Sequence, residues 1–183
     1  GLTRPAPPPA GTAMEVATES IESKAAKNHF IGLWEIVKLV EGAELQKNFQ
    51  PYGWHWSILE PLMREVGSKI TLEQADRRVV ILSNPGATHK HHSTNTLYVS
   101  CSIYNPGEQA PVHRHTSNAS RFVLHGEGGY TTIEGEKCTM QRGDLIVTPA
   151  GTWHDHGNEG SEPVIWVDVL DLPLVENLAV SQF

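Results

Sequence analysis

Histidines are the residues of this chain whose number and spacing could do chemistry. The 183 residues include ten of them, most of which lie between positions 89 and 156. His113 and His115 stand two residues apart in extended sequence, so both imidazoles should project from one face of a strand. A second such pair, His154 and His156, follows a Pro/Gly turn. Because imidazole is a common ligand of divalent metals, we expect a three-histidine metal site with an open face for substrate. Surface histidines that alternate along a strand are the alternative.

The elements that must position these histidines follow residue 76. From there the chain consists of short β-branched runs separated by Gly, Pro, Asn and Asp. Glu134-Gly135 has the composition of a hairpin turn, and no helical pattern interrupts the runs. We therefore expect antiparallel sheets in a sandwich or barrel. The expected strands are Val79–Leu82, Leu97–Tyr104, Ser120–Leu124, Tyr130–Ile133, Lys137–Met140, Leu145–Thr148 and Val164–Val169.

The residues before 77 predict a different structure. Residues 1–12 are Pro-rich and should form an extended or disordered lead-in. Residues 13–76 should form a helical extension, because apolar residues recur at helical spacing up to residue 40 and a second helix fits Trp56–Val66. Thr71 has the position of a helix N-cap. The barrel would then span residues 77–183.

Composition narrows the class of protein. The chain has 14 Lys and Arg against 21 Asp and Glu, a net charge of −7, and this balance argues against a nucleic-acid binder. The longest apolar runs, such as Val79–Leu82, are too short for a membrane span or a signal peptide. We therefore expect a cytoplasmic protein that binds neither nucleic acid nor membrane. Cys101 and Cys138 should be reduced thiols.

The spacing around the histidines resembles the paired motifs of the cupin superfamily. The resemblance implies a mainly β fold, a single cupin (a jelly-roll, antiparallel β-barrel) with the N-terminal helical extension, and a metal held by His113, His115 and His154. Cupins commonly carry a Glu four or five residues after the second histidine, where this chain has Ala119 and Ser120. A divalent ion would then keep its full charge, which favours an anionic substrate. The motifs are Gly107-x5-His113-x-His115 and Gly143-x5-Pro149-x-Gly151-x2-His154-x3-Asn158.

A closer resemblance extends over roughly residues 28–183. It is to the amino-terminal half of gentisate 1,2-dioxygenases and the related salicylate and 1-hydroxy-2-naphthoate dioxygenases. The resemblance implies an Fe(II)-dependent homo-oligomer that uses O2 to cleave the ring of a small aromatic carboxylic acid, with gentisate giving maleylpyruvate. Members of this family are usually about twice as long as this chain. The segments that carry the resemblance are 51–56, 75–79, 84–86, 113–128, 140–149, 153–158 and 163–168.

The resemblance also implies roles for residues around the metal. Arg121 would bind the substrate carboxylate in a bidentate pair, with an ordinary surface arginine as the alternative. Arg77 would be a second carboxylate-side arginine, and Arg78 is a weaker candidate for that role. His156 would hydrogen-bond the ring hydroxyl or shuttle its proton, and Asp168 would orient such groups. Tyr98 and Ser102 stand where the family often has Trp and Gln, so they should shape substrate choice.

Other interpretations stay open from the sequence alone. The chain could be a non-catalytic metal-binding module that lacks a second barrel, or a cupin isomerase or hydrolase. Zinc, nickel and manganese would also accept three imidazoles. His89-Lys-His91-His92 could form a second metal cluster, but a solvated loop is the favoured interpretation because the segment lacks the Pro/Gly framing of the main site.

Overall fold

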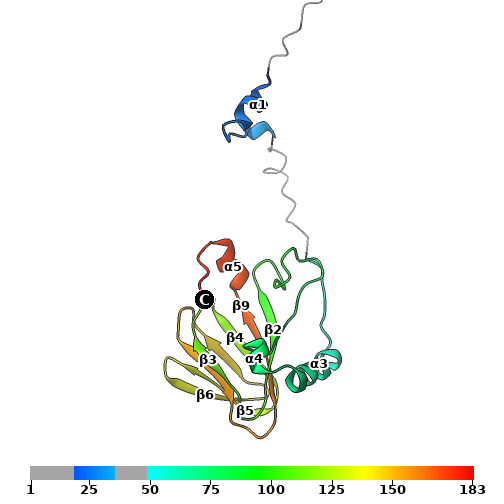
Figure 1. Cartoon of the computed structure of the whole chain (residues 1–183), viewed down its shortest axis with the longest axis vertical. Helices are drawn as coiled ribbons and strands as arrows, with labels where there is room; N and C mark the ends of the chain where they lie inside the picture. The colour runs from blue at the N-terminus through cyan, green and yellow to red at the C-terminus, as the bar shows by residue number, and fades with distance from the viewer. Residues whose placement is uncertain (1–18, 36–48) are drawn as a thin grey trace, which may run out of the picture. The chain divides into compact units, whose positions relative to one another are not determined.

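The computed structural model describes residues 19–35 and 49–183, which fall in two compact units, Gly1–Gln46 and Lys47–Phe183 (Figure 1). In the first unit, helix α1 (Ile21–Ala26) starts where the Ser20 side chain accepts a hydrogen bond from the Ser23 amide. None of the α1 residues is buried. The predicted lead-in, residues 1–12, and the segments 13–18 and 36–48 of the predicted helical extension lie outside the described residues.

The second unit is built on two antiparallel sheets. A five-stranded sheet has the order β1-β2-β9-β4-β7, and a four-stranded sheet has the order β3-β8-β5-β6. The prediction of a mainly β cupin barrel is therefore confirmed. The strands are β1 (Val79–Ile81), β2 (Tyr98–Tyr104), β3 (Gln109–His113), β4 (Ala119–His125), β5 (Glu127–Ile133), β6 (Glu136–Gln141), β7 (Leu145–Thr148), β8 (His154–Asn158) and β9 (Val164–Leu170).

Strands β3 and β8 are missing from the runs that the β-branched pattern predicts. Their sequences, Gln-Ala-Pro-Val-His and His-Asp-His-Gly-Asn, carry a single β-branched residue between them. They pair with each other, and Gln109, Ala110 and His113 lie opposite Gly157, His156 and His154. The two strands that hold the histidine pairs are thus the ones that propensity identifies least well.

A hydrophobic core packs between the two sheets. Trp166 is fully buried and stacks on Tyr104 with ring centroids 4.7 Å apart. Val123 and Met140 complete the packing from β4 and β6. Because the tight hairpin at Glu134-Gly135 connects Ile133 directly to Glu136, β5 and β6 stay in register on this face.

Helix α3 (Trp56–Lys69) covers the outer face of the five-stranded sheet. Leu59 and Met63 are buried against Cys101, Ile103 and Ile165. Gly67 permits this approach, because a Cβ there would lie 2.9 Å from the Ile103 side chain. The helix confirms the prediction over Trp56–Val66 and runs one turn further.

Arg78 fixes the end of α3 rather than lining the cavity. Its guanidinium donates to the Gly67 and Ile70 carbonyls at 3.1 Å and pairs with Glu108. The short helix α4 (Leu72–Ala75) follows, and Thr71 caps it as the sequence predicts. Both helices lie in the range predicted as an extension, yet the compact unit that contains the barrel begins at Lys47.

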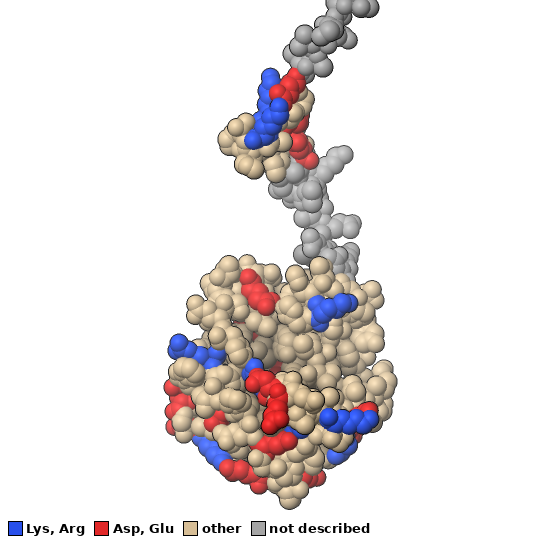
Figure 2. All heavy atoms as spheres, viewed as in Figure 1, with Lys and Arg blue, Asp and Glu red and all other residues tan. Residues whose placement is uncertain are grey.

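The described surface carries mixed charge. On the face shown in Figure 2, basic and acidic side chains alternate over the barrel without forming a continuous basic surface. Among the helices of residues 19–35 and 49–183, none is long and apolar enough to cross a membrane.

The two cysteines should react differently with thiol reagents. Burial raises the pKa of the Cys101 thiol to about 12, whereas Cys138 on β6 is partly exposed. Because the thiolate is the nucleophile, we expect a disulfide reagent to titrate one thiol in the native chain and two in denaturant. Rapid reaction of both thiols in the native chain would contradict the burial of Cys101.

Candidate metal centre

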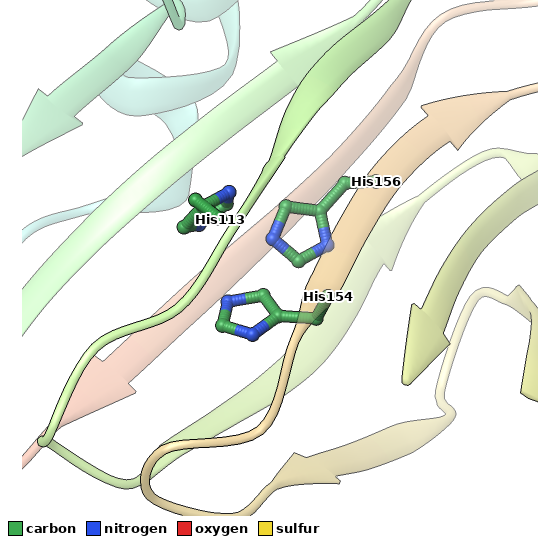
Figure 3. Close-up of side chains that lie close together, drawn as sticks. All are labelled: His113, His154 and His156. Carbon is green, nitrogen blue, oxygen red and sulfur yellow. The ribbon is translucent and has the colours of Figure 1, made fainter. Parts of the chain in front are cut away.

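Four histidines meet at the open end of the barrel. His113 ends β3 and His154 begins β8, and their paired positions bring the ring centroids to 4.3 Å (Figure 3). The ligand nitrogens of His113, His154 and His156 all lie within 4.8 Å of one another. His115 follows the end of β3, and its ring centroid lies 4.8 Å from that of His154 and 5.9 Å from that of His113. The fold therefore gathers both histidine pairs in one place.

Hydrogen bonds separate three of these histidines from the fourth. In His113, His115 and His154, Nδ1 faces a backbone carbonyl two residues away at 2.8–2.9 Å. A carbonyl can only accept, so Nδ1 carries the proton and the lone pair is on Nε2. Metal-ligating histidines characteristically donate their other N–H to such a group. The three residues are thus in the tautomer that a metal requires.

His156 is held differently. Both of its ring nitrogens face the Arg121 guanidinium, which can only donate, with Nδ1 at 2.8 Å and Nε2 at 3.2 Å. A neutral imidazole has a single lone pair, and Arg121 competes for it at either nitrogen. Distance alone groups His156 with His113 and His154, whereas the hydrogen bonds favour His115 as the third ligand. We rely on the hydrogen bonds, because the Arg121 guanidinium faces both nitrogens through which His156 could bind an ion.

Burial keeps the imidazoles neutral. It lowers the pKa of His154 to about 4 and also lowers the pKa of His113. The pKa of His156 is well below its usual value, because burial and then the neighbouring Arg121 charge both disfavour the cation. At neutral pH these rings are in the form that can ligate a metal or accept a proton.

A cavity of about 340 Å³ opens over the histidines. Its polar end is formed by His113, His115, His156 and the two arginines Arg77 and Arg121. The remaining wall combines polar side chains, among them Asp76, Ser102, Asp168 and Gln182, with apolar and aromatic ones, among them Val79, Tyr98, Trp166, Leu170, Leu172 and Phe183. A small planar molecule with an anionic group at one end matches this division.

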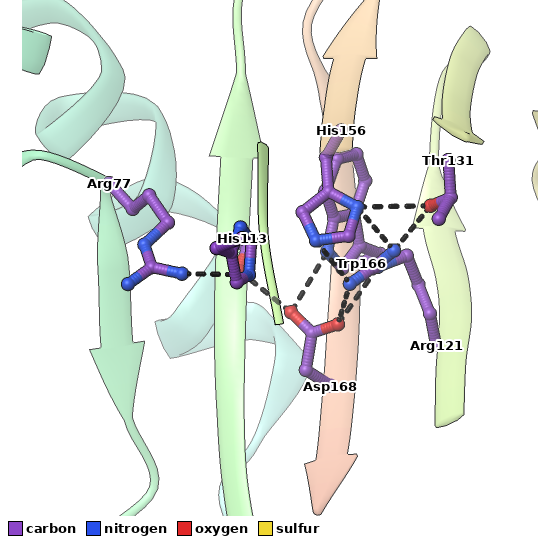
Figure 4. A network of polar contacts seen from close by, with 8 residues as sticks. Arg77, His113, Arg121, Thr131, His156, Trp166 and Asp168 are labelled. Carbon is purple, nitrogen blue, oxygen red and sulfur yellow. Dashed lines mark hydrogen bonds and ion pairs between the residues drawn. The ribbon is translucent and has the colours of Figure 1, made fainter. Parts of the chain in front are cut away.

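Arg121 is held in a buried polar network (Figure 4). Its Nε donates to Asp168 at 2.8 Å, and another guanidinium nitrogen donates to Thr131. The other oxygen of Asp168 accepts from Ser102 and from the Trp166 indole, both at 2.9 Å. Asp168 thus orients Arg121, and Ser102 reaches the cavity wall while bound to Asp168.

Arg77 is the less constrained arginine. Its guanidinium lies 3.0 Å from Nε2 of His113 and pairs with Asp76 at 3.3 Å. The Asp76 side chain is exposed, so that pair does not bury the positive charge of Arg77. Tyr98 lines the same cavity, and burial raises the pKa of its phenol. All six residues expected near the metal, Arg77, Tyr98, Ser102, Arg121, His156 and Asp168, therefore line the cavity.

The C-terminal segment contributes a wall that the sequence does not indicate. Phe183 stacks on His113 with a centroid distance of 5.6 Å, and the Arg77 guanidinium lies 5.0 Å from the Phe183 ring. Backbone bonding between Thr116 and Gln182 holds the segment there. No sequence motif includes Gln182 or Phe183. The sequence also gives no sign of the role of Thr131, which contacts Arg121 from the opposite sheet.

Comparison with known proteins agrees with this description. A model of the cupin domain matches residues 101–170. A gentisate 1,2-dioxygenase of a Ralstonia species is 45% identical over 155 residues, which are 84% of this chain and 44% of the relative. A 5-aminosalicylate 1,2-dioxygenase of a Comamonas species is 35% identical over 90% of this chain and 45% of its own length.

A solved structure is similar over the same region. The salicylate 1,2-dioxygenase of Pseudoaminobacter salicylatoxidans, an adduct with gentisate, superposes with a TM-score of 0.79 at 32% identity. The match covers 87% of this chain and 44% of that one, so the chain spans less than half the length of these relatives. The chain therefore contains a cupin domain, and its resemblance to the gentisate 1,2-dioxygenase family is confirmed.

Proposed function

We propose that this chain is the metal-binding part of a ring-cleaving dioxygenase that acts on a hydroxylated aromatic acid, with gentisate the first substrate to test. One observation carries the proposal. Three imidazoles whose Nδ1 atoms donate to backbone carbonyls stand beside a cavity that two arginines line, and the Arg77 guanidinium lies 3.0 Å from Nε2 of His113. The similar proteins named as gentisate and 5-aminosalicylate dioxygenases support it.

The donor set fits iron(II). His113, His115 and His154 would hold the ion, and Ala119 and Ser120 stand where cupins commonly carry a Glu, so the ligands add no negative charge. Iron(II) at this site would supply the redox activation of O2 that ring cleavage requires. Because the protein ligands are neutral, an anionic substrate would complete the charge balance.

The arginines would orient the substrate carboxylate. Arg77 and Arg121 bring two positive charges to the cavity, where Asp168 pairs with Arg121 in a buried position and the exposed Asp76 pairs with Arg77. Both donor edges of Arg121 already face protein groups, so Arg77 would make the more direct contact. The aromatic ring would then lie between Tyr98 and Phe183, which places its reacting edge toward the histidines.

His156 would handle the ring hydroxyl. Its ring lines the cavity with both nitrogens near Arg121, and the Arg121 charge disfavours its protonation. A neutral imidazole in this position could take the proton of the ring hydroxyl, carry it as imidazolium and then return it. Asp168 would act through Arg121, by holding the guanidinium against His156.

The proposal is tested by anaerobic reconstitution with iron(II), followed by O2 uptake on gentisate, salicylate and 1-hydroxy-2-naphthoate. We expect stoichiometric O2 consumption and a ring-opened product with at least one of them, and none with His154→Ala. A folded, iron-loaded chain that consumes no O2 with any of the three would favour a non-catalytic metal-binding module. Activity that follows zinc or nickel content instead would favour a different cupin reaction.

We also propose that the chain forms a homo-oligomer. Phe122, Leu145 and Val147 are 44–62% exposed on one face of the β4–β7 pair. Apolar side chains grouped in this way favour an interface. Light scattering should give a mass of at least twice the 20.2 kDa of one chain.

A further inference from the structure

A second group of metal-ligating side chains lies outside the cavity. The loop between β1 and β2 carries His89, His91 and His92, and helix α5 (Leu172–Asn177) carries Glu176. Nε2 of His91 and Nε2 of His92 lie 3.2 and 3.1 Å from the same oxygen of Glu176. We call these four residues the loop histidine cluster. Its members come from segments that are more than 80 residues apart in the sequence.

The distances suit a shared ion. Two ligands of a tetrahedral zinc ion, each 2.0–2.1 Å from the metal, are about 3.4 Å apart. The nitrogen-to-oxygen separations here are within a few tenths of that value, and the ligand atoms of His91, His92 and Glu176 all lie within 4.8 Å of one another. Two imidazoles and one carboxylate are also a ligand set that zinc uses in enzymes.

The loop holds the imidazoles together before any ion binds. The His92 amide donates to the His89 carbonyl at 3.0 Å, and the His92 carbonyl accepts from the Asn84 amide at 3.1 Å. The ring centroids of His91 and His92 are 4.4 Å apart, and that of His89 is 5.0 Å from His92. The loop therefore places three imidazoles, each with nitrogen atoms that can ligate a metal, next to one another.

The cluster is partly buried but stays accessible to solvent on one side. The side chain of His92 is 10% exposed, whereas those of His91 and Glu176 are 38% and 35% exposed. An ion could therefore enter from solvent and keep a water ligand, with His89 available as a further ligand.

We propose that the loop histidine cluster is a second metal site, able to bind zinc, with His91, His92 and Glu176 as ligands. It shares no residue with the three-histidine centre, and it is independent of the proposed function. An ion there would join the β1–β2 loop to α5. The loop leads into Tyr98 and α5 starts at Leu172 and leads toward Phe183, all of which line the cavity. Zinc at this site would therefore fix two walls of the cavity.

Zinc stoichiometry tests the site without reference to activity. Untagged protein is dialysed against buffered zinc and its metal content measured. We expect two zinc ions per chain in the unmodified protein, one in His92→Ala, one in His154→Ala, and none when both substitutions are combined. Because the two sites are counted separately, failure of one does not hide failure of the other.

His125→Ala is the matched control. His125 also lies near a carboxylate, 3.7 Å from Glu162, but it belongs to neither site, so this variant should keep both ions. If circular dichroism shows that His92→Ala is not folded, His91→Ala and Glu176→Gln replace it, because the side chains of His91 and Glu176 are partly exposed. Each of these substitutions should lower the zinc affinity of the cluster by more than roughly tenfold. Unchanged stoichiometry in the folded cluster variants, or an equal loss in His125→Ala, would overturn the proposal.

Hydrogen exchange gives a second, independent result. Zinc should slow exchange of the amides in residues 178–183 of the unmodified chain and of His154→Ala, because α5 becomes anchored. The same addition to His92→Ala should leave their exchange unchanged. If zinc slowed amide exchange equally in His92→Ala, the effect would come from an ion bound outside the loop histidine cluster.

Discussion

We expect His154→Ala to abolish metal retention at the barrel centre and His156→Ala to leave it intact. At the proposed site, removing His154 deletes one of three protein ligands. Loss of an outer partner of a ligand typically costs about 10–100-fold in affinity, so loss of a ligand itself should exceed ~100-fold. Both ring nitrogens of His156 face the Arg121 guanidinium, so His156 should contribute no bond to the ion. Iron content after gel filtration, with zinc excluded, measures the difference.

The same measurement has an internal control. His113→Ala and His115→Ala should behave like His154→Ala, because each ring is oriented by a backbone carbonyl in the same way. His156→Ala should keep full iron content and lose most turnover. If His156→Ala emptied the site while His115→Ala left it filled, the grouping by nitrogen distance would be the correct one, and the tautomer argument would fail.

Asp168→Ala destabilises the chain by about 3–5 kcal/mol. Asp168 is the anionic partner of Arg121, and both side chains are almost fully buried, at 12% and 6% exposure. Without Asp168 the guanidinium would remain buried without a counter-charge. The free energy of unfolding of the metal-free chain, from urea titration, should fall by this amount, and the melting temperature by roughly 10 °C.

An exposed ion pair provides the comparison for Asp168→Ala. The Lys69–Glu65 pair has side chains that are 69% and 56% exposed, so Glu65→Gln should change the unfolding free energy by no more than ~0.5 kcal/mol. Replacing both members of the buried pair, Arg121→Met with Asp168→Leu, should recover much of the loss, since no unpaired charge remains. A similar small effect of Asp168→Ala and Glu65→Gln would show that the Arg121 charge is solvated by other groups.

The sequence predicts the parts of the site that depend on local spacing. Residues two apart on a strand share a face, and His154 and His156 do point into the barrel together from β8. The strands with β-branched, alternating residues are found close to the expected bounds. The capping box at Thr71 and the turn at Glu134-Gly135 depend on neighbouring residues only, and both are present.

Local spacing does not predict contacts that depend on the pairing register of two strands or that join residues of the two sheets. Arg121 meets Asp168 because β4 and β9 pair with these residues opposite each other. His156 reaches Arg121 across the barrel from the other sheet. Nothing local to Arg121 indicates either neighbour, which is why the sequence suggests a free carboxylate-binding arginine and the structure has a fully engaged one.

The position of Phe183 depends on the longest-range contact of this kind. Its ring reaches His113 only because Gln182 bonds to Thr116, a residue in the loop that follows β3. Gln182 and Phe183 lie outside every motif of the sequence. The segment beside the proposed metal ligands is therefore positioned by backbone hydrogen bonding and not by side-chain chemistry that could be recognised in the sequence.

The hydrogen bonds from the proposed ligand histidines to backbone carbonyls should affect how fast the ion enters. Each imidazole is fixed by a carbonyl only two residues away, within its own stretch of chain. The rings therefore have little rotamer freedom left to lose when an ion arrives. Reorganisation during loading should be small, and the uptake rate should depend on passage past Arg77 and Phe183 at the cavity mouth rather than on rearrangement of the ligands.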